Sequence, residues 1–173
     1  MKEFIRYTFG QSSLGDFIAA VSDIGLVAFE FADAQTDAVN ALRNRFSEAA
    51  IEEDAALLSE MVRKLATLVD HPDRRLDIVL DMRGSDFERR VWALLREVPA
   101  GATTTYGAIA AKMGTPRDAR DVTAAIAANS IAILIPCHRV VKKDGSLSGY
   151  RWGFKRKRAL LSREQTHNAF ELV

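Results

Sequence analysis

The spacing of hydrophobic residues changes along the chain and predicts where strands and helices lie. Residues 3–9 and 15–31 have the alternation typical of strands, with a turn at 23–25. From Gln35 the spacing becomes helical and predicts two helices, whose apolar faces are formed by Val39, Leu42 and Phe46 and by Leu57, Met61, Leu65 and Leu68. Residues 76–80 predict one more strand.

The second half of the chain has mostly helical spacing. It predicts four helices, over residues 86–97, 106–113, 116–128 and 154–163. Ser85 and Glu88 form a capping box at the start of the first of these helices. Only a short turn at 114–116 separates the second helix from the third, so this pair is a candidate helix-turn-helix.

These patterns predict an α/β fold with two lobes. A small sheet with flanking helices would occupy residues 1–84, and a mostly helical lobe with the helix-turn-helix would occupy residues 85–173. Residues 1–86 carry 9 Lys and Arg against 16 Asp and Glu, whereas residues 87–173 carry 15 against 7. A basic lobe is typical of a phosphate-binding surface, although a solvated basic face would give the same count.

The composition favours a protein of the cytoplasm, and we expect it to act as a monomer. Of 173 residues, 48% are hydrophobic, which is enough for a buried core. No apolar run approaches the roughly 20 residues of a membrane span, and the first residues lack the apolar segment of a secretory signal. A single cysteine fits a reducing compartment. That cysteine and three scattered histidines lack zinc-ligand spacing, so we expect no metal and no other cofactor.

The candidate for chemistry is the single cysteine, Cys137. It follows an apolar run that ends at Ile135, which we expect to be a strand stopped by Pro136. Cysteines in such surroundings are usually packing residues. Here His138 supplies a proton acceptor and Arg139 a cation next to the thiol, and both favour thiolate. The pattern therefore indicates a nucleophile.

The sequence Pro136-Cys137-His138-Arg139 resembles the active-site motif of the methylated-DNA–protein-cysteine methyltransferases, which repair O6-alkylguanine. The similarity covers residues 87–165 and extends less closely to 4–31 and 76–86. Residues 148–153 are most similar to the carboxy-terminal portion of the Ada-type members. The resemblance implies that the chain binds double-stranded DNA, flips the damaged base and transfers its alkyl group irreversibly to Cys137, once per molecule and without a cofactor.

The resemblance also implies catalytic roles. His138 would take the proton of Cys137 through a water molecule, and Glu164 would orient the histidine ring. Tyr106 would contact the base and assist the departure of guanine, and Asn129 would brace the turn that carries the cysteine. Taken alone, Glu164 would be an ion-pair partner, Tyr106 a half-buried anchor and Asn129 a helix cap.

The resemblance makes the helix over 116–128 the recognition helix, which enters the minor groove. Its small residues, among them Ala119 and Ala124, would let it approach that narrow groove, although helix propensity also explains them. Arg120 matches the side chain that replaces the flipped base in the stack. The helix departs from the family pattern in two carboxylates, Asp118 and Asp121. They would either weaken binding to phosphates, or cap the start of the helix or orient Arg120.

The resemblance assigns a base pocket to the residues that follow the cysteine. Backbone groups of Val140, Tyr150 and Arg151 would read the edge of guanine, and Ser148 would form part of the wall. Trp152 adds bulk beside that wall, so we expect the large substrate O6-benzylguanine to react poorly.

Two other classes of function fit parts of the sequence. A cysteine hydrolase could use Cys137, His138 and Glu164, but its base normally lies far from the nucleophile in sequence. A non-catalytic DNA-damage sensor or regulator could use the helix-turn-helix alone, because a fold does not fix a function. The presence of Cys137 argues against the sensor, and the lack of further cysteines argues against the zinc-dependent regulation of Ada-type proteins.

Overall fold

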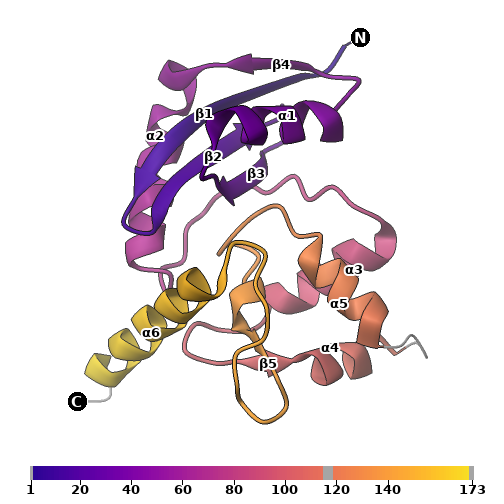
Figure 1. Ribbon diagram of the computed structural model, residues 1–173, viewed down its shortest axis with the longest axis vertical. Coiled ribbons are helices and arrows are strands. Elements are labelled where there is room, and N and C mark those ends of the chain that lie inside the picture. Colours follow the sequence, from indigo (N-terminus) through magenta and orange to yellow (C-terminus); the bar gives the residue numbers. More distant parts are fainter. Residues whose placement is uncertain (1, 115–118, 172–173) are drawn as a thin grey trace. The chain divides into compact units, whose positions relative to one another are not determined.

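The computed structural model describes residues 2–114 and 119–171 (Figure 1). The chain forms two compact units. The first runs to Asp70 and includes residues 75–82, and the second contains residues 71–74 and the chain from Arg83 onward. The predicted α/β class is confirmed by the sheet of the first unit and the helices of the second. The assignment of separate functions to residues 1–84 and 85–173 stays a prediction.

The first unit contains a four-stranded sheet with the order β3-β2-β1-β4. Its strands are β1 (Phe4–Ser12), β2 (Gly15–Val21), β3 (Leu26–Phe31) and β4 (Ala50–Glu53). The first three are antiparallel neighbours, as hairpin connections require, and β4 lies parallel to β1 with Ala50 opposite Phe4.

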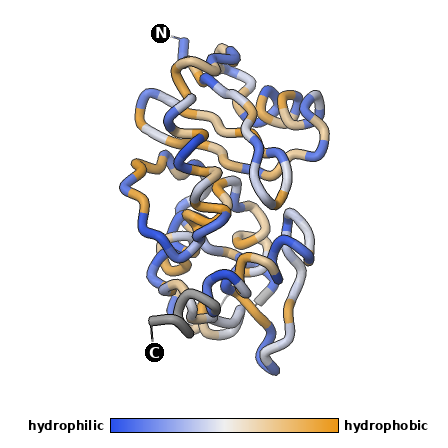
Figure 2. The backbone as a smooth tube through the Cα atoms, turned by 90° about the vertical axis from the view of Figure 1, so that its left-hand side faces the viewer, coloured by the Kyte–Doolittle hydropathy of each residue, from blue (hydrophilic) through white to orange (hydrophobic). Residues whose placement is uncertain are grey.

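Two helices, α1 (Gln35–Arg45) and α2 (Ala55–Asp70), cover the sheet. Because side chains alternate along a strand, Ile5 and Tyr7 share the face that packs against Leu42 of α1. Gly10 lies on the other face, where an added Cβ would collide with Phe17 and Val62, so α2 needs glycine there. Strands β2 and β3 have runs of consecutive buried residues, as a sheet covered on both faces requires, and their hydropathy can be followed in Figure 2.

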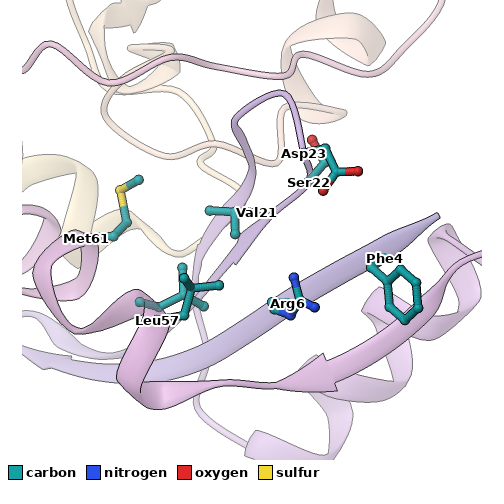
Figure 3. Close-up of a pocket in the computed structure, with 8 residues that line it drawn as sticks. Phe4, Arg6, Val21, Ser22, Asp23, Leu57 and Met61 are labelled. Carbon is teal, nitrogen blue, oxygen red and sulfur yellow. The ribbon is translucent and has the colours of Figure 1, made fainter.

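A pocket of about 320 Å³ is formed by β1, the end of β2 and α2 (Figure 3). Its lining is mainly apolar and includes Phe4, Val21, Leu57 and Met61, with Arg6 and Asp23 as charged members. None of the residues predicted to take part in the reaction lines this pocket.

The second unit is mostly helical, with α3 (Asp86–Arg96), α4 (Tyr106–Met113), α5 (Ala119–Ala127) and α6 (Phe154–Glu171). The capping box of Ser85 and Glu88 is present at the start of α3. The indole nitrogen of Trp92 in α3 donates to the carbonyl of Ala125 in α5 over 2.8 Å. Residues 115–118 lie outside the described residues. They include most of the predicted turn at 114–116, the start of the helix predicted over 116–128, and Asp118. The helix-turn-helix therefore stays a prediction.

A short pairing of distant segments brings the predicted reactive residues together. Strand β5 (Thr104–Thr105) lies parallel to β6 (Val140–Val141). Helix α4 begins immediately after β5, at Tyr106, and the single 3₁₀ turn η1 (Cys137–Arg139) ends immediately before β6. Thr105 caps α4 by accepting from the amide of Ala108.

The structure corrects two predicted strands. Residues 76–80 form no strand, and only an isolated bridge joins Leu80 to Leu26. The apolar run before Pro136 consists of buried turns. Strand β4 was not predicted, because its sequence Ala-Ile-Glu-Glu lacks a clear alternation of apolar and polar residues.

Among residues 2–114 and 119–171, no helix combines the length and hydrophobicity that crossing a bilayer requires.

Candidate active site

The backbone before Cys137 makes two tight turns. Ile133 has a φ of 67°, in the left-handed region that a β-branched residue rarely adopts. Pro136 has φ −81° and ψ 62°, which are the values of an inverse γ-turn, and the amide of Cys137 donates to the carbonyl of Ile135 over 2.8 Å. These turns hold Cys137 in the interior, with 5% of its surface exposed.

Asn129 ties these turns to the sulfur. Its side-chain nitrogen donates to Cys137 Sγ over 3.2 Å and to the carbonyl of Ile135 over 3.0 Å. Its side-chain oxygen accepts from the amide of Ile131 over 2.9 Å. All polar atoms of this buried side chain therefore act on the segment that carries the nucleophile.

The thiol of Cys137 is protonated at neutral pH. Burial raises its pKa from 9.0 to about 11, against the opposing effects of the Asn129 hydrogen bond and of the Lys157 and Arg151 cations. With that pKa, only about one molecule in ten thousand holds a thiolate at pH 7. A nucleophilic reaction at Cys137 therefore needs a base that removes the proton.

His138 is the base that lies next in the chain, and its ring is completely buried. Its Nε2 donates to Glu164 Oε1 over 2.7 Å, which leaves Nδ1 as the nitrogen that can accept a proton. No described residue bonds to that Nδ1. Burial lowers the pKa of His138 below its ordinary value, so the ring is neutral at physiological pH and can act as a base.

Arg139 does not have the role that the sequence suggested for it. We expected its charge to favour the thiolate, but its guanidinium binds Glu164, with Nη2 at 2.7 Å from Oε1. The cations that lower the pKa of Cys137 are instead Lys157 and Arg151.

Tyr106, Ser148 and Lys157 form a chain of hydrogen bonds. The hydroxyls of Tyr106 and Ser148 lie 2.8 Å apart, and Lys157 Nζ donates to Ser148 Oγ over 2.8 Å. Lys157 also donates to the carbonyl of Val140 over 2.6 Å. Its side chain is fully buried, and burial lowers its pKa from 10.5 to about 8.

Lys157 was not predicted as a site residue, because it lies in a run of basic residues that resembles a solvated helix face. Helical spacing contains the missing signal. Positions 157, 160, 161 and 164 fall on one face of α6, and two of them are leucines. A lysine and a glutamate that share a buried face with leucines are candidates for a site.

The predicted wall of the base pocket is made of residues that contact one another. Tyr150 and Trp152 pack edge to face, with ring centroids 5.3 Å apart. Arg151 lies over the Trp152 ring at 5.5 Å and donates to the carbonyl of Asn129 over 2.7 Å. The hydroxyl of Tyr150 is buried and has no hydrogen-bond partner among the described residues.

Helix α5 has one buried face and one exposed face. Val122, Ala125 and Ile126 are buried, whereas Arg120 and Ala124 are exposed and are four positions apart, so they share the outer face. The outer face thus presents one long cation beside a methyl group. The side chain of Ala119 lies outside the described residues.

In the part of the chain that the structure describes, no three His, Cys, Asp or Glu side chains are grouped so that they could hold a metal ion.

Comparison with known proteins identifies the same region. Residues 86–166 match the family model of the 6-O-methylguanine DNA methyltransferase DNA-binding domain. The Ada protein of Escherichia coli, a bifunctional transcriptional activator and DNA repair enzyme, is 39% identical over 160 residues, which are 92% of this chain and 45% of Ada. The chain therefore spans less than half the length of this relative.

A shorter relative and a solved structure match over most of their length. The inducible methylated-DNA–protein-cysteine methyltransferase of Bacillus subtilis is 37% identical over 71% of this chain and 69% of its own. The crystal structure of Mycobacterium tuberculosis OGT in complex with DNA is 34% identical, covers 93% of both chains and has a TM-score of 0.78. The resemblance of the Pro-Cys-His-Arg motif is thus confirmed, and the chain belongs to the methylated-DNA–protein-cysteine methyltransferase family.

Proposed function

We propose that this chain repairs O6-alkylguanine in double-stranded DNA by moving the alkyl group to its own Cys137. The observation that carries the proposal is a buried thiol followed by a neutral histidine, which has one ring nitrogen held by Glu164 and the other without a partner among the described residues. This arrangement supplies both the nucleophile and the acceptor for its proton.

The reaction is a displacement at the alkyl carbon. The proton of Cys137 passes to His138 Nδ1 through a bridging water, and the imidazolium that forms is stabilised by Glu164. The sulfur then forms a bond to the alkyl carbon as the bond from that carbon to O6 breaks. Guanine leaves with a negative charge, which a hydrogen bond from the Tyr106 hydroxyl stabilises.

The product explains why the protein acts once. An S-alkylcysteine is a thioether without a leaving group that water can displace under mild conditions. The protein is therefore a stoichiometric S-methyltransferase, and it needs no cofactor.

Binding of DNA is assigned to the basic second lobe, residues 85–173, acting as a monomer. The outer face of α5, with Ala124 and Arg120 exposed, would lie in the minor groove, and Arg120 would fill the space of the flipped base. Val140, Ser148, Tyr150, Arg151 and Trp152 would surround that base. Residues 1–84 form the accompanying lobe, and a reducing cytoplasm would keep Cys137 as a thiol.

The test uses a duplex oligonucleotide with one O6-methylguanine, mixed with the protein at several ratios. Intact mass and peptide mapping should show a plateau at one methyl group per protein, on Cys137, and Cys137→Ser should abolish it. Repair beyond one equivalent would mean turnover, as in a hydrolase. Tight binding without transfer would favour a damage sensor and contradict the proposal.

A further inference from the structure

The carboxylate of Glu164 accepts hydrogen bonds from two basic side chains, those of His138 and Arg139. His138 Nε2 donates to Oε1 over 2.7 Å. Arg139 Nη2 also donates to Oε1 over 2.7 Å, and Arg139 Nε lies 3.1 Å from Oε1 and 3.2 Å from Oε2. Glu164 and His138 are fully buried and Arg139 is nearly so. The group that orients the histidine is therefore an ion pair and not a lone carboxylate.

The position of Arg139 does not depend on Glu164 alone. Its Nη1 donates to the carbonyl of Val98 over 2.7 Å and its Nη2 to the carbonyl of Pro72 over 3.3 Å. A guanidinium presents its donors in a rigid plane, so these two carbonyls fix where its charge lies. The cation is thus held beside Glu164 by the backbone of two separate segments.

A fixed cation at this place changes how the histidine responds to its carboxylate. A buried carboxylate at hydrogen-bond distance favours the charged imidazolium, and a histidine that is already protonated cannot accept another proton. The guanidinium neutralises the carboxylate while leaving its hydrogen bond to Nε2 in place. The ring keeps its orientation and is not forced into its charged form.

We propose that Arg139 is a positioning residue for the reaction, which holds the carboxylate of Glu164 in place and offsets its charge so that His138 is free to accept the thiol proton. This inference rests on the proposed function. In the step that it serves, the proton leaves Cys137 and arrives at Nδ1 of His138, while the proton on Nε2 remains bound there and hydrogen-bonded to Glu164.

The charges around His138 are consistent with this role. Burial is the largest cause that lowers the pKa of His138, and Arg139 and Lys157 lower it further. Glu164 raises that pKa through its hydrogen bond and its charge. Removal of the Arg139 cation should therefore raise the pKa of His138, so that the base becomes protonated at a higher pH.

The test compares Arg139→Gln and Arg139→Lys with the unaltered chain. Single-turnover methyl transfer is measured from pH 5 to pH 9, and the titration of His138 is followed separately by NMR of labelled histidine. In Arg139→Gln, the acidic midpoint of the rate and the His138 pKa should both rise by about one unit, a tenfold change in the proton affinity of the ring. Arg139→Lys keeps the charge and should keep the midpoint, with a lower rate at every pH because the forked contacts are lost.

Arg63→Gln is the matched control, since Arg63 pairs with Glu60 on the exposed side of α2 and should alter neither readout. An equal loss of rate at every pH in Arg139→Gln, with an unchanged His138 pKa, would reduce Arg139 to a structural role. If Arg139→Gln fails to fold, the role of Arg139 is tested by the His138 titration in the unaltered chain and by the rate profile of Arg139→Lys. A His138 that titrates at or above its ordinary pKa in the unaltered chain would overturn the inference, and so would a midpoint that rises in Arg139→Lys.

The NMR titration does not require any methyl transfer. If the unaltered chain transfers no methyl group but the His138 pKa still rises in Arg139→Gln, the proposed function fails while the effect of Arg139 on His138 stands.

Discussion

The side-chain nitrogen of Asn129 donates to the sulfur of Cys137 over 3.2 Å, and the same nitrogen holds the carbonyl of the residue before Pro136. One amide thus controls both the electrostatics of the nucleophile and the shape of the turn that carries it. The hydrogen bond lowers the pKa of Cys137, in opposition to burial.

Replacement of Asn129 by alanine should therefore affect stability and reactivity together. The amide of Ile131 would lose its buried partner, at a cost of about 1–3 kcal/mol in the free energy of unfolding, whereas the carbonyl of Ile135 would keep its hydrogen bond from the amide of Cys137. The pKa of Cys137 should rise further. Urea unfolding and the pH dependence of alkylation by iodoacetamide measure the two effects. Asn40→Ala, on the exposed side of α1, should change neither, and equal thiol pKa values in both variants would contradict the role of Asn129.

Lys157 and Cys137 should make opposite contributions to the pH dependence of stability. The folded state lowers the pKa of Lys157 to about 8, so the unfolded chain binds more protons above that pH and stability rises as the pH increases from about 8 toward the unfolded pKa of 10.5. The folded state raises the pKa of Cys137 from 9.0 to about 11, so the thiol makes stability fall from about pH 9 upward.

The two contributions can be separated by substitution. The unaltered chain should gain stability mainly between about pH 8 and 9, Cys137→Ser should continue to gain up to about pH 10, and Lys157→Met should show no gain in that range. Urea unfolding at half-unit steps measures the curves. Identical curves for the three proteins would mean that neither group changes its pKa on folding.

Tyr106→Phe should slow methyl transfer by about a hundredfold, which is the lower end of the contribution of a positioned proton donor. The ring remains, so binding of DNA should be unchanged. Single-turnover rates and gel-shift titrations separate the two quantities. Tyr7→Phe makes the same substitution at a tyrosine in the core of the first unit and serves as the control. A Tyr106→Phe protein that reacts at the normal rate would remove the assisting role.

Arg120→Ala should slow repair of duplex DNA by at least about tenfold, because unstacking a base costs a few kcal/mol that the inserted side chain offsets. The effect should be much smaller on a single-stranded oligonucleotide, where no base has to leave a stack. Rates on the two substrates are compared at the same salt concentration. The same loss on both substrates would show that Arg120 acts through general DNA affinity and not as a wedge.

Trp152→Gly should improve the reaction with O6-benzylguanine relative to O6-methylguanine in DNA. Trp152 is 9% exposed and packs on Tyr150, so removal of the indole opens the wall and also costs about 3–5 kcal/mol of stability. The ratio of the two rates, measured on folded protein at low temperature, corrects for that loss. An unchanged ratio would show that the indole does not limit the size of the substrate.

Local rules predicted the elements whose signals are local. Ser85 and Glu88 form the predicted capping box of α3, because their side chains reach the backbone of the first turn whatever the surrounding structure. The strand predicted before Pro136 was wrong, because consecutive apolar residues indicate burial but do not distinguish a strand from buried turns. The φ of 67° at Ile133 depends on tertiary contacts that no local pattern encodes.

The site residues that belong to a sequence motif were predictable, whereas those whose role depends on tertiary packing were not. Cys137, His138 and Glu164 were identified from the resemblance, and the structure places His138 against Glu164. The buried position of Lys157 was missed, since a charged residue in a basic run is normally solvated. The partner of Arg139 was also missed, because it comes from a helix 25 residues away in sequence.

The order in which the site is completed follows from the same separation in sequence. Cys137 and His138 are synthesised before α6, and until that helix docks, His138 has no carboxylate and Val140 lacks the Lys157 ammonium. Because a chain is synthesised at only about 5–20 residues per second, the thiol spends seconds without the partners that tune it. A newly made molecule therefore passes through a stage in which its cysteine is present but not yet competent for the reaction, and the docking of α6 completes the site.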